Sequence, residues 1–408
     1  MDKTFNMVAG WMIDGTGSAA QKDILLRVED GIIASVGHAK SGNATSRPGM
    51  QSLDLSACTI LPGLVDSHVH LTLSGTLDQE LRRRQLSFSF ERSRPLIEER
   101  IAKHLRRGIL ALRDGGDCGG HVLRFKIEHH PNPGGQCPIH LKSAGRGWRA
   151  KGRYGKLIGD PPAEGVSLAE CISRGTDPID HVKIINSGLN SLTEFGKQTS
   201  PQFSSDELRA AVKAARERGL KTMVHANGVV PVREAIEAGC DSIEHGFFMG
   251  RENLERMVER QVVWVPTAFS MKAFLSYALS GSVEADTAAR NLEHKMEQLA
   301  SARKMGVRIA MGTDAGGFGI KHGSALIEEF RIFLDAGFSV EEVARCASLE
   351  GAGLLGIENE IGTIGAGSPA TFVAVPGPPS HLPDSLDSAR AVYARGIKIH
   401  SIAPSPSA

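Results

Sequence analysis

The sequence has few features that would direct the protein to nucleic acid, to a membrane or to an oxidising compartment. Its 408 residues carry 47 lysines and arginines against 46 aspartates and glutamates, so no excess of charge favours a polyanionic partner. No apolar run approaches the roughly 18 residues of a membrane-spanning helix, and no basic segment followed by an apolar core opens the chain. The six cysteines include no Cys-x-x-Cys pair, which argues against a cysteine metal knuckle or redox motif. We therefore expect a cytoplasmic protein with free thiols and a small-molecule substrate, with its oligomeric state open.

The most informative motif is a pair of histidines, His68 and His70, at the end of an apolar run. Because side chains alternate across a strand, this spacing directs both imidazoles to one face. Two neutral imidazoles at a strand end are half of a site for a divalent cation, of which zinc is the commonest protein partner. The same pair also occurs by chance in half-buried strands, so the interpretation needs support from other residues.

Four further residues provide this support, each in or just after a short apolar, β-branched run. They are Lys183, His225, His245 and Asp314. Each run leads into glycine or a polar turn, as a strand passing into a loop does. A parallel barrel collects the carboxyl ends of its strands at one rim, where catalytic residues lie. The six residues are therefore predicted to meet at one rim.

Eight apolar runs alternate with helical patterns, which is the signature of a (β/α)8 TIM barrel. The predicted strands lie near residues 59–66, 109–114, 139–145, 181–187, 221–226, 242–246, 262–267 and 308–313. One intervening helix, Ser204 to Arg218, opens with Ser-Ser-Asp-Glu and is followed by Gly219, as an N-capped helix with a C-terminal glycine is. The barrel is expected over residues 59–357. The β-rich ends, 1–58 and 358–408, are predicted to pair into one small β-sandwich beside it.

The chain resembles the metal-dependent hydrolases of the amidohydrolase superfamily. The match runs through Pro-Gly-Leu-Val-Asp-Ser-His-Val-His, Val-Lys-Ile, His-Ala-Asn-Gly, Ser-Ile-Glu-His-Gly and Gly-Thr-Asp-Ala-Gly. Within the superfamily, the segments 201–208, 237–246 and 361–370 resemble the imidazolonepropionase-like group, which contains Xaa-Pro dipeptidases. The resemblance implies two divalent metal ions, most simply zinc. It assigns His68, His70 and Asp314 to one ion, His225 and His245 to the other, and Lys183, carboxylated by carbon dioxide, to a bridge between them.

Such a site predicts hydrolysis of an amide-like C–N bond, as in a dipeptide or an N-acyl amino acid. Two cations would lower the pKa of a bridging water toward neutrality and polarise the scissile carbonyl. Asp314 would then accept a proton from the attacking hydroxide and pass it to the leaving amine.

Two other functions stay open at this point. A mononuclear deaminase or cyclic amide hydrolase uses the same barrel, but deaminases and imidazolonepropionase carry a glutamate shortly after the fifth-strand histidine. This chain has Ala226, Asn227 and Gly228 there. A non-catalytic scaffold is disfavoured because every ligand position is filled. The number of metal ions bound per chain, two, one or none, separates the three.

The substrate is the least determined part of the prediction. The segment Lys142 to Lys156 holds six basic residues, two aromatic residues and no acid. It is either a solvated loop or a loop that grips a substrate carboxylate through Arg146, with Tyr154 beside it. His322 is either a second substrate contact or a helix-start residue. Relatives usually carry a His-containing, Gly-rich sequence after the Gly-Arg here, and its absence leaves room for a substrate other than an Xaa-Pro dipeptide.

Overall fold

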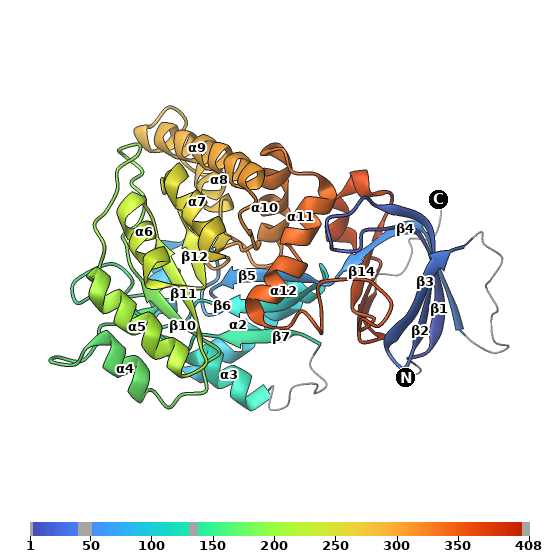
Figure 1. Cartoon of the computed structure of the whole chain (residues 1–408), viewed down its shortest axis with the longest axis horizontal. Helices are drawn as coiled ribbons and strands as arrows, with labels where there is room; N and C mark the ends of the chain where they lie inside the picture. Colours follow the sequence, from blue (N-terminus) through green and yellow to red (C-terminus); the bar gives the residue numbers. More distant parts are fainter. Residues whose placement is uncertain (1–2, 40–50, 130–137, 402–408) are drawn as a thin grey trace.

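The computed structural model describes residues 3–39, 51–129 and 138–401. Cys137 and the last seven residues lie outside this part. The chain forms a larger α/β unit and, beside it, a smaller β-sheet to which both chain ends contribute (Figure 1). Within the described residues, no helix combines the length and the apolar character needed to cross a bilayer.

Short parallel strands form the centre of the α/β unit. One sheet contains β5 (Leu64–Val69), β6 (Ile109–Asp114) and β7 (His140–Ser143). The other has the order β13-β12-β11-β10-β8-β9, with β8 (Gly147–Trp148), β9 (Gly159–Asp160), β10 (His181–Ile185), β11 (Lys221–Ala226), β12 (Ser242–His245) and β13 (Val263–Val265). Buried residues occupy nearly every position of these strands, which explains why their sequences read as continuous apolar runs.

The segment 308–315 joins the two sheets through backbone hydrogen bonds. The Ala310 amide donates to the Trp264 carbonyl of β13 at 3.0 Å, and the Ser67 amide of β5 donates to the Met311 carbonyl at 2.9 Å. On the opposite side, the Asp180 amide donates to the Ser143 carbonyl at 2.9 Å. The segment 308–313 forms an isolated bridge, Ile309 with Trp264, in place of the predicted strand, but it lies between the first and seventh predicted strands, as a barrel-type fold requires.

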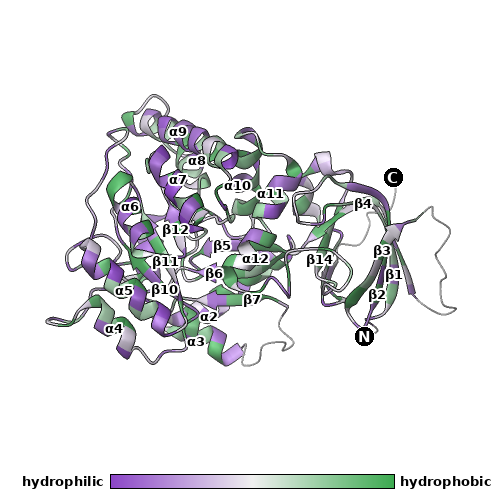
Figure 2. Cartoon of the chain, in the orientation of Figure 1, coloured by the Kyte–Doolittle hydropathy of each residue, from purple (hydrophilic) through white to green (hydrophobic). Residues whose placement is uncertain are grey.

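Helices surround these strands (Figure 1). Their bounds are α1 (Gln79–Gln85), α2 (Phe90–Leu105), α3 (His121–His129), α4 (Leu168–Arg174), α5 (Ser205–Glu217), α6 (Val229–Ala238), α7 (Arg251–Arg260), α8 (Phe269–Leu275), α9 (Val283–Met305), α10 (Ser324–Asp335), α11 (Val340–Cys346) and α12 (Leu349–Leu355). Figure 2 shows hydrophobic and hydrophilic residues mixed along them. In α5, Leu208, Ala211 and Ala215 are buried on one face, and the predicted cap is present because the Ser204 side chain accepts from the Glu207 amide.

The smaller sheet combines both chain ends. Its order is β16-β15-β14-β4-β1-β2-β3, with β1 (Phe5–Met12), β2 (Gln21–Glu29), β3 (Ile32–His38), β4 (Gln51–Pro62), β14 (Phe372–Pro376), β15 (Ala391–Ala394) and β16 (Ile397–Ser401). β2 and β3 form a hairpin through Glu-Asp-Gly, with positive φ at both Asp30 and Gly31.

This sheet is continuous in its hydrogen bonding, yet it packs on itself. The rings of Phe5 on β1 and Tyr393 on β15 lie 5.5 Å apart, although β4 and β14 separate their strands. In a flat sheet, three strand spacings would place them roughly 14 Å apart. The sheet therefore curls so that β1 and β15 share a core, and it is one continuous sheet where the sequence predicted a small β-sandwich.

One predicted strand, 59–66, is wrong in its bounds. The apolar run belongs to two elements, because β4 continues to Pro62 in the smaller sheet and β5 begins at Leu64. Gly63 lies between them, where an added Cβ would approach Ile361 and Leu110 side-chain atoms at 2.8 Å. Hydrophobicity alone does not mark such a junction, because both strands are buried there.

Candidate metal centre

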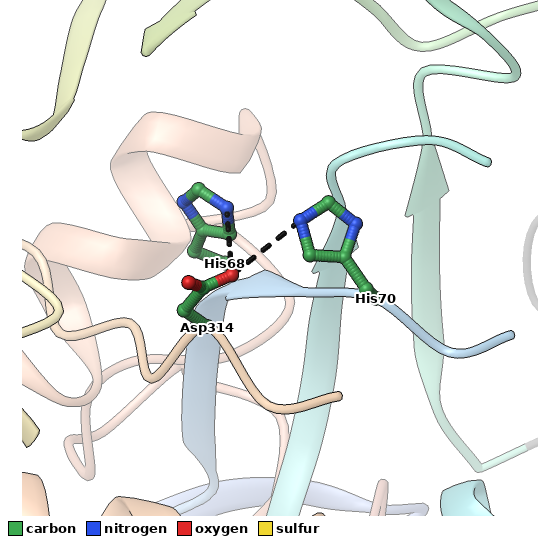
Figure 3. A group of neighbouring side chains, drawn as sticks. All are labelled: His68, His70 and Asp314. Carbon is green, nitrogen blue, oxygen red and sulfur yellow. Dashed lines mark ion pairs between the residues drawn. The ribbon is translucent and has the colours of Figure 1, made fainter. Parts of the chain in front are cut away.

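Three of the predicted ligands form a compact group at the carboxyl end of β5. The Asp314 Oδ1 atom lies 3.6 Å from Nε2 of His68 and 3.4 Å from Nε2 of His70, so that both imidazoles point at one carboxylate oxygen (Figure 3). Ligand atoms of the three residues lie within 4.8 Å of one another. The backbone fixes this approach, because the Asp314 amide donates to the His68 carbonyl at 2.8 Å.

The outer nitrogens of both histidines have hydrogen-bond acceptors. His68 Nδ1 lies 2.7 Å from Glu244 Oε2, and His70 Nδ1 lies 3.1 Å from the Gly116 carbonyl oxygen. Since these oxygens accept, each Nδ1 carries the proton and each Nε2 keeps a free lone pair. Nε2 of His68 is buried without a hydrogen-bond partner among the described residues. A buried unpaired acceptor of this kind fits a metal ligand.

His225 and His245 lie directly beside this group. Their ring centroids are 4.5 Å apart, and the His245 ring is 5.0 Å from that of His68. His225 donates through Nε2 to the Gly188 carbonyl at 3.1 Å, which leaves Nδ1 free. His245 uses Nδ1 in a 2.7 Å hydrogen bond with the Thr267 hydroxyl.

Lys183 on β10 is buried, and its charge acts on each of the four candidate histidines. Its Nζ has no hydrogen-bond partner within the described part of the chain. Burial lowers the pKa of the Lys183 amine to about 8, and Glu244 and Asp314 oppose that change. A buried amine with a lowered pKa is more often neutral, which is the form that can react with carbon dioxide.

Burial also keeps the histidines neutral. It is the largest cause lowering the pKa of all four, and the charge of Lys183 adds to it in each case. The pKa falls to about 3 for His70 and for His225. Neutral imidazoles are the metal-binding form. The shared effect of Lys183 also places its amine within electrostatic reach of every candidate histidine.

Two candidate ligands have a strained backbone. His245 has φ 67° and Asp314 has φ 60°, a left-handed conformation that is uncommon for residues other than glycine. Such strain persists where the surrounding structure requires it, often at functional sites. Burial raises the pKa of the Asp314 carboxyl to about 6, against the opposing charges of Lys183 and Arg82.

The sequence did not predict the role of Glu244, whose carboxylate hydrogen-bonds the candidate ligand His68. Its Oε2 binds His68, while its Oε1 accepts from Arg113 Nη2 at 2.6 Å and from the Ser242 hydroxyl at 2.5 Å. Glu244 and Arg113 are both buried. The available signal was a pair of opposite charges, Glu244 and Arg113, within two predicted strands, since buried charges occur in pairs.

We expect Glu244→Gln to weaken metal binding by about 10- to 100-fold. The amide keeps the shape, but its NH2 group must face either the Nδ1 proton of His68 or the Arg113 guanidinium, and both are donors. Metal affinity measured by competition with a chelator tests this. Glu350→Gln is the matched control, because Glu350 is a buried glutamate paired with Arg308 and Arg345 and contacts no candidate ligand. Unchanged affinity in Glu244→Gln would show that this hydrogen bond does not position His68.

The three predicted substrate residues have different placements. Tyr154 lies at the cluster, with its ring 5.5 Å from that of His225. Burial, followed by the charge of Asp314, raises the pKa of its phenol above the usual range, so the hydroxyl stays protonated. This placement favours a substrate-binding role for Tyr154.

Arg146 and His322 face elsewhere. Arg146 pairs with Asp160 at 3.1 Å and lines a pocket with Val182, which alternates with Lys183 on β10 and so faces the opposite side. His322 is buried, and its Nε2 hydrogen-bonds the Leu73 carbonyl at 2.7 Å. These positions favour a surface ion pair for Arg146 and a structural role for His322 over the predicted substrate contacts.

The chain matches the family model described as "Amidohydrolase family" over residues 59–394. An uncharacterized protein of Mycobacterium tuberculosis is 28% identical over 271 residues, which cover 65% of this chain and 66% of that protein, just under two thirds of its length. An imidazolonepropionase of Porphyromonas gingivalis is 24% identical over 381 residues, which cover 85% of this chain and 82% of the relative.

The fold of the chain also resembles that of solved structures. The crystal structure of a Xaa-Pro dipeptidase with bound methionine in the active site superposes with a TM-score of 0.78 at 26% identity. The match covers 98% of this chain and 100% of the dipeptidase. The resemblance predicted from the motifs is therefore confirmed, including its imidazolonepropionase and Xaa-Pro dipeptidase branches.

Proposed function

Because the chain belongs to the amidohydrolase family, we propose that it is a binuclear metal-dependent hydrolase that cleaves an amide-like C–N bond of a dipeptide or an N-acyl amino acid. The observation that carries this proposal is the position of Lys183. Its Nζ is buried without a hydrogen-bond partner among the described residues, and its charge acts on four histidines and on Asp314. A one-metal site needs no lysine there, whereas Lys183 carboxylated on its amine would supply a carboxylate that two metal ions could share.

The donor atoms suit two divalent ions, most simply zinc. His68, His70 and Asp314 would hold one ion, and His225 and His245 the other, with carboxylated Lys183 shared between them. Bound ions of this kind activate water and polarise a carbonyl group. Donors limited to imidazole nitrogen and carboxylate oxygen fit zinc better than a soft, thiolate-preferring metal.

The protein's own groups would position the substrate and move the proton. Asp314 can take a proton at its carboxylate and return it to the leaving amine, and its raised pKa brings it closer to the range useful for that exchange. The protonated Tyr154 hydroxyl can donate a hydrogen bond to a substrate oxygen. Glu244 holds His68 in one tautomer.

The proposal includes a closed eight-stranded barrel, with segment 308–313 as its eighth strand. Hydrogen bonds from that segment to both β13 and β5 support it. In such a barrel all six predicted ligands would lie at one rim.

A mononuclear deaminase fits the site less well. Asn227 occupies the region where the deaminase-type glutamate is expected, and its Oδ1 accepts from the Phe247 amide at 3.0 Å. The backbone amide of Asn227 donates to the Ser187 hydroxyl at 2.9 Å. Asn227 thus connects loops and supplies no acid for proton transfer.

We expect close to two metal ions per chain in protein produced with zinc and bicarbonate. Five side-chain ligands and a carbamate exceed what one roughly tetrahedral ion binds. Elemental analysis of the purified protein measures this number directly. One ion in a fully active enzyme would contradict the binuclear proposal, and metal-free activity would contradict any metal mechanism.

The reaction itself is tested by screening the metal-loaded protein against N-acyl amino acids, dipeptides, lactams and cyclic ureides. We expect turnover of the first two classes. Turnover restricted to ring substrates would favour the cyclic amide hydrolase, and release of ammonia from an aminated ring would favour the deaminase.

A further inference from the structure

A cleft of about 380 Å³ lies between α1 and the loops that follow His70 and Asp314. Its lining residues are Leu73, Gln79, Arg82, Arg83, Leu86, Leu157 and Phe318. The loop that carries Phe318 packs against a predicted ligand, because a Cβ added at Gly316 would lie 3.2 Å from the Cβ of His70. Four of its side chains are apolar, which suits the hydrophobic part of a small molecule.

Arg82 on α1 points toward the candidate metal centre. Its Nη1 donates to the Gly316 carbonyl at 3.0 Å, and its guanidinium lies 5.5 Å from the centre of the Phe318 ring. Both partners belong to the loop that follows Asp314. The charge of Arg82 also opposes the burial-driven rise in the pKa of Asp314 and of Tyr154. The guanidinium therefore lies within electrostatic reach of two groups that the proposed reaction uses.

Arg82 differs from Arg83 on the same helix, and from Arg146, in having no carboxylate partner among the described residues. Arg83 pairs with Glu80 at 2.7 Å, and Arg146 pairs with Asp160 at 3.1 Å. Among the residues that the structure describes, no carboxylate lies within 4.0 Å of the Arg82 guanidinium, whose hydrogen bond goes to Gly316. A guanidinium carries five N–H donors. Arg82 is half-buried, and none of its donors is a buried atom without a partner among the described residues, so the donors that Gly316 does not use can reach a ligand in the cleft.

We propose that Arg82 is the specificity-determining residue that binds a free carboxylate on the substrate. The inference rests on the proposed amide hydrolysis and narrows its substrates to N-acyl amino acids or dipeptides that have an apolar side chain and an unblocked C-terminal carboxylate. The planar fork of the guanidinium matches the two oxygens of a carboxylate, while the leucines and Phe318 contact the side chain.

The experiment compares ligands that differ in the carboxylate alone. L-leucine and L-leucinol are titrated calorimetrically into the metal-loaded wild type and into Arg82→Gln, Arg82→Lys and Arg84→Ala. Arg84 is the matched control because it is an exposed arginine of the same helix that does not line the cleft. Turnover of N-acetyl-L-leucine is measured on the same samples, and thermal unfolding verifies that each variant is folded.

We expect Arg82→Gln to weaken L-leucine binding by roughly ten- to a hundredfold, the range of one charge-assisted hydrogen bond in a partly desolvated site. L-leucinol binding should not change. Arg82→Lys should recover part of the loss, because an ammonium cannot supply the two-donor fork, and Arg84→Ala should bind both ligands as the wild type does.

Three results would overturn the inference. They are the absence of L-leucine binding by the wild type, a preference for L-leucine that survives in Arg82→Gln, and an equal loss of both ligands in that variant. Turnover separates this inference from the proposed function. Arg82-dependent binding of L-leucine without hydrolysis of any amide would support the carboxylate site and reject the proposed hydrolase.

Discussion

Replacing Lys183 with alanine should lower kcat/KM by roughly 10²–10³-fold, because loss of the proposed bridge removes part of the several kcal/mol of transition-state stabilisation that metal ions supply. The same variant should bind fewer than two metal ions. Its fold should persist, since no described hydrogen bond of the Nζ atom is lost. Steady-state kinetics and elemental analysis on the same preparation measure both effects.

Chemical rescue makes this test specific to a carbamate. Added acetate or propionate can enter the space left by the lysine chain and supply a bridging carboxylate, so part of the rate should return in Lys183→Ala alone. Lys213→Ala is the control, because Lys213 is an exposed lysine of α5. Its rate should equal that of the wild type and should not change when the acids are added. A Lys183→Ala enzyme with two metals and the wild-type rate would reject the bridge.

Asp314→Asn should reduce kcat by about 10²–10⁴-fold, the usual effect of removing a general base. The substitution keeps the size of the side chain and removes its ability to accept a proton. Metal content should be measured alongside the rate, because Asp314 is also a proposed ligand. Asp286→Asn, which removes an exposed acid on α9, controls for the change in net charge.

The two proposed roles of Asp314, general base and metal ligand, predict different responses of the Asp314→Asn rate to added zinc. If proton transfer is its main role, the loss of rate should persist when excess zinc restores full metal content. A loss that disappears with added zinc would make Asp314 a ligand only. A variant with full metal and a near wild-type rate would make it a structural residue.

The predicted ligands were accessible from sequence because their signals are local. Each lies in or just after a short apolar run. If these runs are parallel strands of one barrel, their carboxyl ends all lie at the same rim. The structure accordingly brings His68, His70 and Asp314 together, with His225, His245 and Lys183 beside them.

The features that were missed depend on contacts between distant segments. Glu244 supports His68 from a strand 176 positions away, and no spacing rule links the two. The basic residues around Arg146 predict a substrate contact there, but the direction of a loop side chain depends on its partners. Asp160 binds Arg146 in a separate pocket, whereas Arg82 hydrogen-bonds Gly316 next to Asp314.

The junction at Gly63 has a consequence for how the site is assembled during synthesis. β4 pairs with β14 through Pro62 and Phe372, and β5 with its histidines follows after a single residue. While residues 372–376 are still inside the ribosome, β4 lacks that neighbour and exposes an unpaired edge beside the strand that bears His68. Pairing across more than 300 positions also slows folding, because a long loop must close first. We therefore expect a nascent chain stalled before β14 to associate through that edge of β4, next to the strand that bears His68.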